Sequence, residues 1–352
     1  MGSFIPEDLV LNILFRLPAD VIYGIMQYVC REWYNIVRSP TFVSTHLQKS
    51  TGGAFLLQAA KSRPRYFLRM GKCGDDIELV EAEFPPSRDL ASSCNGLVVM
   101  VHYNCRELCI TNPVLKQQLT LPPHPKLVAK KFCKLAYDVS SGVYKVVVCN
   151  PWDPPTVLTV GDKTWRPLRS SCLFNRIVSD LHINRSLSLG SFLYWVSECA
   201  LFVVSFNAET ETFQEIPFPQ GCTSGSPVAL IEMGSFPCLM RWKEKWTWEL
   251  WLSRDQENAG WEKMSDINLL GQSSLIRVLS DDDRCFLPLG WLKCGELMAF
   301  LVPLNKSRII AYNVRLGKIH SALQLNPRMQ HCNPFFIPHV NSLVSLTNFC
   351  SS

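Results

Sequence analysis

Residues 1–50 read MGSFIPEDLVLNILFRLPADVIYGIMQYVCREWYNIVRSPTFVSTHLQKS, and their apolar side chains recur at helical spacing. Pro6 favours a helix start, because the N–H group that proline lacks would have no partner in the first helical turn. Glu7 and Asp8 then place negative charge at the positive end of the helix dipole. We expect this helix to end before Pro18, since proline disfavours helical backbone in the residue that precedes it. Its apolar stripe consists of Leu9, Ile13, Leu14 and Leu17.

Two further short helices are predicted in the same stretch. Residues 20–29 form the second and residues 30–38 the third, and Ser39-Pro40 is interpreted as the stop of the third. We expect Trp33 to hold the three helices together. Helices of about ten residues are too short to be stable alone in water, and a module of roughly fifty residues buries little surface. We therefore expect part of its apolar surface to pack against a neighbour or a partner.

The sequence beyond residue 50 has the composition of strands. Short segments rich in β-branched and aromatic residues are bounded by Gly, Asn, Asp or Pro, as strands are, and no long helix is predicted there. These segments include 97–101, 144–148, 201–206 and 309–312. The chain has 352 residues, of which 47% are hydrophobic, so it is long enough for about two domains with a large core. The predicted fold class is α+β for the whole chain, a small all-α module followed by a large all-β domain.

A hairpin signal repeats along this β-rich part. An Asn or Asp that suits a turn is followed by an apolar anchor in the segments 207–213, 255–261 and 313–319. The anchors Trp165, Phe213 and Trp261 follow one another at intervals of 48 residues, close to the length of a kelch-like blade of four strands. With residues 54–86 counted as one unit, the spacing predicts six blades. A β-sandwich or an irregular β-barrel with regular hairpins is the alternative fold.

The order of residues in the helical stretch resembles the F-box of plant F-box proteins. The matching residues are Ile5-Pro6-Glu7-Asp8-Leu9, Ile13-Leu14, Arg16-Leu17-Pro18, Val29-Cys30-Arg31, Trp33, Ser39-Pro40, Phe42 and His46-Leu47. In that family the motif binds the Skp-type adaptor of a cullin-based SCF ubiquitin ligase. The resemblance implies that the adaptor contacts Pro6, Leu9, Leu17, Pro18, Val29, Cys30 and Trp33. The alternative from the residues alone is a helical cap that packs on the core of the β-rich domain.

The β-rich part is similar to the F-box-associated, kelch-like domains of the same proteins. The landmarks are Ser93-Cys94-Asn95-Gly96-Leu97, Asn112-Pro113, Leu121-Pro122-Pro123, Phe192-Leu193-Tyr194-Trp195, Ser205-Phe206, Ile216-Pro217, Glu249-Leu250-Trp251 and Gly295-Glu296. The resemblance implies an F-box domain over 1–50 and a kelch-like β-propeller for substrate recognition over 51–352. We expect blade loops to form the surface that binds a client protein, because loops on a rigid scaffold concentrate binding function.

Charge and cysteine content narrow the class of protein. The net charge of +5 is spread along the chain, without the dense basic stripe typical of nucleic-acid binding, so no nucleic-acid partner is expected. The 15 cysteines include no CxxC pair and suit a reducing compartment, the cytoplasm or nucleus. No apolar run is long enough to cross a bilayer, so no membrane association is expected.

Residue patterns that would indicate catalysis are weak. The seven histidines show neither HxxxH nor HExxH spacing, and no serine stands in a GxSxG sequence. The run Asp281–Asp283 is interpreted as a solvated loop and not as a metal site. We expect a non-catalytic subunit of a ubiquitin ligase, with no cofactor, that recruits a client protein. The alternatives are a stand-alone propeller that reads a peptide or a carbohydrate and, less favoured, an oxidoreductase on a propeller.

Overall fold

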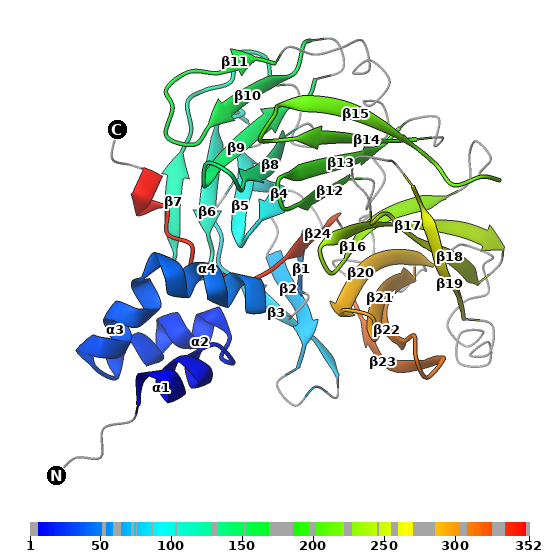
Figure 1. Cartoon of the computed structure of the whole chain (residues 1–352), viewed down its shortest axis with the longest axis horizontal. Helices are drawn as coiled ribbons and strands as arrows, with labels where there is room; N and C mark the ends of the chain where they lie inside the picture. The colour runs from blue at the N-terminus through cyan, green and yellow to red at the C-terminus, as the bar shows by residue number, and fades with distance from the viewer. Residues whose placement is uncertain are drawn as a thin grey trace.

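The chain forms four helices followed by a ring of six four-stranded sheets, as the computed structural model in Figure 1 shows. The structure describes residues 6–349 except 51–53, 59–64, 72–73, 75, 86, 103, 128–132, 151–152, 169–185, 198–201, 222–226, 245, 255–259, 270–285, 303–307 and 326–334. The helices are α1 (Glu7–Leu14), α2 (Ala19–Gly24), α3 (Arg31–Arg38) and α4 (Pro40–Lys49), with a 3-10 turn η1 (Met26–Tyr28).

Two details of the helical stretch were predicted wrongly. The second helix is not continuous, because α2 ends at Gly24 and Ile25 leaves the helical region with φ −132°. The third helix ends at Arg38, as predicted, but a fourth helix that was not predicted follows it directly. The Ser39 hydroxyl accepts a hydrogen bond from the Phe42 N–H (3.3 Å) and Pro40 occupies the first turn, so this pair begins α4. A Ser-Pro pair suits the end of one helix and the start of the next equally well.

Each sheet is one blade of a β-propeller, and the blades follow one another along the chain. The strands are β1 (Ala54–Gln58), β2 (Arg65–Met70), β3 (Ile77–Ala82), β4 (Arg88–Cys94), β5 (Leu97–His102), β6 (Leu108–Asn112), β7 (Gln117–Thr120), β8 (Cys133–Asp138), β9 (Val143–Val148), β10 (Thr156–Thr159), β11 (Arg166–Pro167), β12 (Ser186–Leu189), β13 (Phe192–Val196), β14 (Phe202–Asn207), β15 (Thr212–Pro217), β16 (Val228–Met233), β17 (Phe236–Glu244), β18 (Thr247–Leu252), β19 (Glu262–Asn268), β20 (Leu287–Lys293), β21 (Leu297–Val302), β22 (Arg308–Asn313), β23 (Lys318–Gln324) and β24 (Phe335–His339). The predicted six blades are confirmed, and the sandwich and barrel alternatives are wrong.

The ring is closed by the last strand of the chain. Five blades consist of four consecutive strands, whereas the sixth has the order β24-β1-β2-β3. The antiparallel register of β24 and β1 runs from Ala54 opposite His339 to Gln58 opposite Phe335. The first and last strands therefore belong to one sheet, which leaves no open edge between the two ends of the ring.

The aromatic anchors of the repeat connect neighbouring blades. The Trp165 indole N–H donates to the Pro122 carbonyl (3.0 Å), and the Trp261 indole N–H donates to the Pro217 carbonyl (2.8 Å). The Tyr312 hydroxyl makes a similar bond to the Asn268 carbonyl (2.9 Å). In each case the acceptor follows or ends the outermost strand of the preceding blade. The repeat in the sequence thus marks a repeated contact between blades.

The helices lie on one face of the ring, beside β6 and β7 in Figure 1. β24 and the other first strands lie nearest the axis, and β1 begins where β24 ends. The chain therefore enters the propeller from the helices and leaves it after His339 on the same face. The strand ends from which one blade leads to the next lie on the opposite face.

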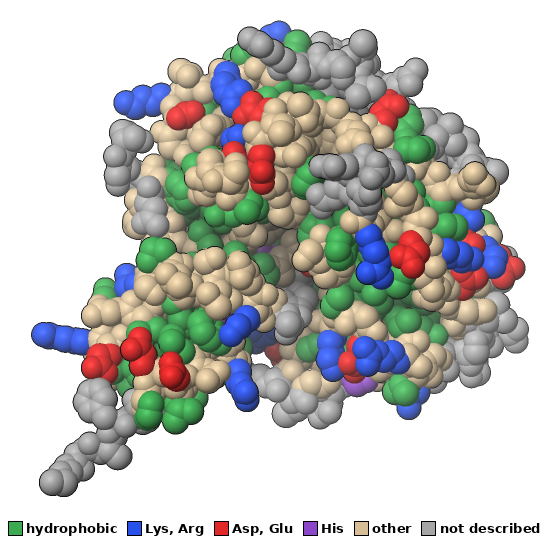
Figure 2. Space-filling view, in the orientation of Figure 1, with side chains coloured by type: hydrophobic (Ala, Val, Ile, Leu, Met, Phe, Trp, Pro, Cys, Tyr) green, Lys and Arg blue, Asp and Glu red, His purple; other side chains and the backbone are tan. Residues whose placement is uncertain are grey.

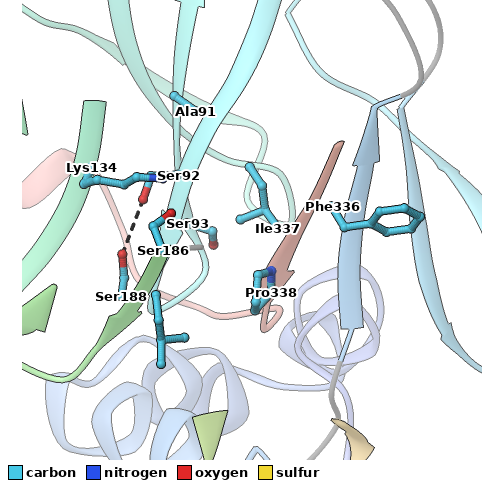
Figure 3. Close-up of a pocket in the computed structure, with 10 residues that line it drawn as sticks. Ala91, Ser92, Ser93, Lys134, Ser186, Ser188, Phe336, Ile337 and Pro338 are labelled. Carbon is cyan, nitrogen blue, oxygen red and sulfur yellow. Dashed lines mark hydrogen bonds between the residues drawn. The ribbon is translucent and has the colours of Figure 1, made fainter. Parts of the chain in front are cut away.

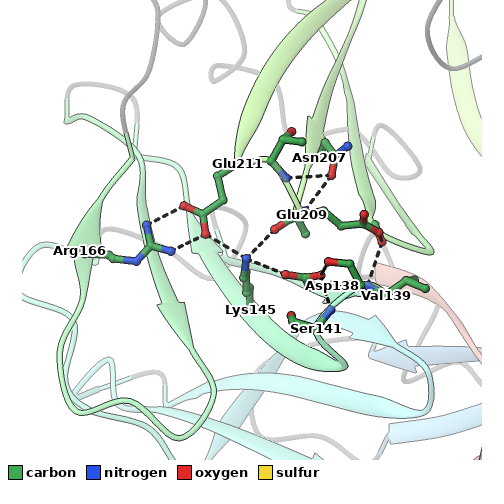
Figure 4. Close-up of polar contacts among 12 residues, drawn as sticks. Asp138, Val139, Ser141, Lys145, Arg166, Asn207, Glu209 and Glu211 are labelled. Atoms are coloured by element: carbon green, nitrogen blue, oxygen red, sulfur yellow. Dashed lines mark hydrogen bonds and ion pairs between the residues drawn. The ribbon is translucent and has the colours of Figure 1, made fainter.

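A buried ion cluster joins the blade of β8–β11 to the blade of β12–β15 (Figure 4). The Lys145 ammonium lies 3.0 Å from both Asp138 Oδ2 and Glu211 Oε1 and donates to the Ala208 carbonyl (2.6 Å). Arg166 pairs with the same glutamate (Nη1 to Oε2, 2.6 Å). Burial alone would raise the pKa of Asp138, but hydrogen bonds from Ser140, Ser141 and Lys145 lower it well below its usual range.

Replacing the central cation should destabilise the propeller. In Lys145→Met the buried Asp138 carboxylate loses its ion-pair partner, while Glu211 keeps Arg166. We expect the free energy of unfolding to fall by about 3 kcal/mol. Urea unfolding measures this loss. Lys116→Met is the matched control, because Lys116 pairs with Glu83 at 2.7 Å on the open surface and its removal should change stability little. Equal losses in the two variants would contradict the argument.

The cluster also predicts a dependence of stability on pH. Because the folded-state pKa of Asp138 is lowered, its contribution is present above the unfolded-state pKa and is lost as the pH falls. We expect the free energy of unfolding of the natural chain to decline below about pH 5 more steeply than that of Asp138→Asn. Unfolding curves over a pH series test this, and parallel declines would argue against it.

Candidate functional site

The predicted adaptor-binding residues differ in how far they are exposed. Leu9 on α1 is 54% exposed and Val29 after η1 is 57% exposed. Pro6, Pro18 and Cys30 are exposed as well, and each is the N-cap of a helix. Leu17 and Trp33 are half-buried and pack against the core of the helical module. The last two therefore support the module from within as well as forming part of its surface.

An apolar surface on the helical module carries this candidate site. Of the nine large apolar side chains that are exposed in the described residues, six lie between residues 9 and 34. Figure 2 shows apolar and acidic side chains next to one another on this part of the molecule. The six are Leu9, Ile13, Ile25, Tyr28, Val29 and Tyr34, and we call them the helical apolar surface. Because exposed apolar groups concentrated in one small module mark an interaction site, this surface can bind a partner.

The sequence prediction missed four members of this surface. Ile13 was placed in the apolar stripe of α1 but not among the binding residues. Ile25 and Tyr28 were missed because a continuous second helix gave no sign of which side would face outward. Tyr34, on α3, was missed because the sequence did not show which side of that helix would be covered. The apolar side chains of α1 lie on two sides of the helix. Leu9 and Ile13 face solvent, whereas Val10 and Leu14 are buried.

A small core fixes the helices beneath this surface. Val10, Leu14, Ile22 and Phe42 are buried, and the Phe42 ring stacks on Phe15 with 4.9 Å between centroids. His46 on α4 donates a hydrogen bond from Nε2 to the Leu17 carbonyl (2.8 Å). The unpredicted helix α4 therefore holds the turn before Pro18, which displays part of the candidate site.

The core of the helical module continues into the propeller. Val114 and Leu115, from the turn between β6 and β7, and Leu343, from the segment after β24, pack in the same cluster. An ion pair between Asp20 and Arg69, 3.7 Å apart, joins α2 to β2. The module thus packs on the propeller with one side, while the helical apolar surface remains exposed on another.

The segment after β24 is held by two motifs that the sequence singled out. The Asn112 side-chain amide donates to the carbonyls of Ser342 (3.0 Å) and Val344 (2.8 Å), and its Oδ1 accepts from the Val114 N–H (2.9 Å). Gly96 has φ +80°, and a Cβ there would lie 2.2 Å from Ser342 Oγ. The Ser342 hydroxyl donates to the Asn95 carbonyl (2.7 Å). Asn112 and Gly96 therefore fix the segment that carries Leu343 to the helices.

In the part of the chain that the structure describes, no group of three His, Cys, Asp or Glu side chains is placed to hold a metal ion, and no helix is long and apolar enough to cross a membrane. The acidic run Asp281–Asp283 lies outside the described residues, as do His182 and His331.

Family models match both parts of the chain. A model of the F-box-associated β-propeller domain matches residues 73–319, and a model of the F-box domain matches residues 3–45. The first match covers more than half of the chain, and the fold agrees with it. The chain belongs to the family of proteins with an F-box-associated β-propeller domain.

Similar curated proteins come from Arabidopsis thaliana. An F-box/LRR-repeat/kelch-repeat protein is 24% identical over 227 residues, which cover 61% of this chain and 60% of that protein. Putative F-box only protein 10 is 24% identical over 328 residues, which cover 87% of this chain and 82% of that protein. Among solved structures, a chain of the nidogen/laminin complex has a TM-score of 0.50 at 11% identity, covering 83% of this chain and 100% of that one. This last likeness concerns the fold alone.

Adding a methyl group at Gly96 should loosen the segment after β24. In Gly96→Ala the new methyl group is placed on a left-handed backbone and also collides with Ser342. In Gly190→Ala only the backbone cost applies, because Gly190 has φ +55° and no atom lies within 4 Å of a Cβ there. We expect Gly96→Ala to lose about 2 kcal/mol more free energy of unfolding than Gly190→Ala. Denaturant unfolding of both variants measures the difference, and a Gly96→Ala loss no larger than the control would refute the contact.

Proposed function

We propose that this chain is the substrate-recognition subunit of an SCF-type ubiquitin ligase. Residues 1–50 would form the domain that binds a Skp-type adaptor, and through it a cullin. Residues 51–352 would form the domain that recruits a client protein for ubiquitination. A subunit of this kind acts in the cytoplasm or nucleus and needs no catalytic group or cofactor of its own.

The helical apolar surface is the observation that carries the proposal. A helical cap with a purely structural role would have its apolar side chains covered by the propeller, yet Leu9 and Val29 are more than half exposed. Exposed apolar anchors are the kind of group that provides most of the binding energy in a helix-mediated interface, about 2 kcal/mol or more each. We propose that Pro6, Leu9, Leu17, Pro18, Val29, Cys30 and Trp33 contact the adaptor, together with Ile13, Ile25, Tyr28 and Tyr34.

The propeller would act by positioning. The packing of Leu115 and Leu343 against the helices supports a fixed angle between the adaptor-binding surface and the ring. A client bound to the face of the ring opposite the helices would be held at a constant place relative to the ligase. Its lysines would then meet the ubiquitin-conjugating enzyme at a high effective concentration, which accelerates transfer without acid or base chemistry by this chain.

Charging the helical apolar surface should abolish adaptor binding without unfolding the chain. Val29→Asp places a carboxylate on an exposed position, so we expect the affinity for the Skp-type adaptor to fall at least about tenfold, as for loss of a buried anchor. Co-purification and titration of the purified proteins measure the effect.

Leu316→Asp is the control for this experiment. Leu316 is 64% exposed on the turn between β22 and β23, far from the helices in the chain, and its change should leave adaptor binding intact. If Val29→Asp binds the adaptor as well as Leu316→Asp does, the proposed surface is wrong. If the natural chain binds no Skp-type adaptor at all, a stand-alone propeller that reads a peptide or a carbohydrate becomes the better account.

A further inference from the structure

A small cavity lies among the inner strands of the propeller. It measures about 50 Å³ and is lined by residues of β4, β8, β12 and β24 (Figure 3). A water molecule needs roughly 10–15 Å³ on this measure, so the cavity has room for about four water-sized groups. One end of its lining is apolar, with Phe336 and Ile337, and the other is polar, with Lys134 and four serines.

Among the described residues of the lining, Lys134 is the only charged one. The residue is 9% exposed, and in the described part of the chain no hydrogen-bond acceptor or carboxylate contacts its ammonium group. Burial lowers its pKa to about 8, so the group still carries its charge at neutral pH. Because a buried charge without a partner is costly, the structure holds an ammonium whose natural complement is missing from the lining.

The serines supply further donors around the same space. Ser92 Oγ accepts from the Leu135 N–H (3.1 Å) and lies 3.4 Å from Ser188 Oγ, which is a long contact. Ser93 is engaged with His339, 2.8 Å from Nδ1. Ser186 has no hydrogen-bond partner for its hydroxyl among the described residues, and Ser188 has only the long contact. Two hydroxyl groups and three ammonium N–H bonds are therefore available to an acceptor.

The charge of the lining points to an anion. Burial lowers the pKa of His339 to about 4, so its ring is neutral and adds no charge of either sign. None of the lining residues that the structure describes is acidic. An ammonium with nearby hydroxyls can bind a carboxylate by charge-assisted hydrogen bonds, and three heavy atoms fit the room available.

We propose that the axial cavity of the propeller is a binding site for a carboxylate group, held by Lys134 with Ser186 and Ser188. The carboxylate comes from a small organic acid or from an acidic side chain of a bound protein. The apolar part of the lining, at Ile337, accommodates the carbon atoms attached to it. This site is independent of the proposed ligase role, and its test requires no adaptor.

Thermal unfolding of the purified full-length chain tests the site. Sodium formate and sodium acetate are compared with sodium chloride at equal ionic strength and neutral pH. We expect the carboxylate salts to raise the unfolding midpoint by about 2 °C at saturation. In Lys134→Met the difference between the salts should vanish, while the midpoint in chloride stays the same or rises because an unpaired buried charge has gone. Lys163→Met, a change at an exposed lysine, should keep the full difference.

Ser188→Ala provides a second variant if Lys134→Met does not fold. It removes one hydroxyl that has only a long contact, so we expect the chain to fold and the concentration of formate for half-maximal effect to rise about fivefold. A Gly-Glu-Gly peptide with blocked ends distinguishes an acidic side chain from a small organic acid as the source of the carboxylate. An equal rise with this peptide assigns the site to acidic side chains, and a rise with formate and acetate alone assigns it to small acids. Equal midpoints in formate and chloride, or a formate effect that both variants retain, would overturn the proposal.

Discussion

The antiparallel pairing of β24 with β1 is the interaction on which the rest of the molecule depends. It joins residues near the two ends of the propeller, from Ala54 opposite His339 to Gln58 opposite Phe335. Without it β1 would present an open strand edge and β24 would have no sheet to join. Contacts between positions so far apart are entropically costly to form, so the closure must be secured by groups beyond the ladder itself.

The same pairing decides where the helical module lies. β1 begins and β24 ends on one face of the ring, so the module that precedes β1 and the segment that follows β24 meet there. Leu343 joins the hydrophobic core of the helices, and Asn112 and Gly96 hold the segment that carries it. Closure of the ring and attachment of the helices are therefore one structural feature. A receptor that must hold a client at a constant distance from its ligase would benefit from this coupling.

Two lysines within the ring show how differently a buried cation can be treated. Lys145 has two carboxylates and a carbonyl within 3.0 Å and joins neighbouring blades. Lys134 reaches a cavity in which no described lining residue carries the opposite charge. Since a buried charge is favourable only with a partner, the first is explained by the fold alone and the second calls for something from outside it.

Local patterns in the sequence determined the classes of element and the number of blades. Helical stripes, proline positions and the 48-residue spacing of aromatic anchors predicted a helical module followed by six blades, because each depends on neighbours close in the chain. The missed helix α4 and the break at Gly24 show the limit of such local patterns. A Ser-Pro pair has the same local preference whether or not a new helix follows it, and a glycine has the same preference whether or not the helix continues. Only the tertiary structure decided which side of α1 faces solvent and which carbonyls the Asn112 side chain binds. It also decided that no described residue of the cavity lining pairs with the Lys134 ammonium. These properties depend on residues distant in the chain, such as Ser342 and Ser188, whose approach is set by ring closure and the packing of blades.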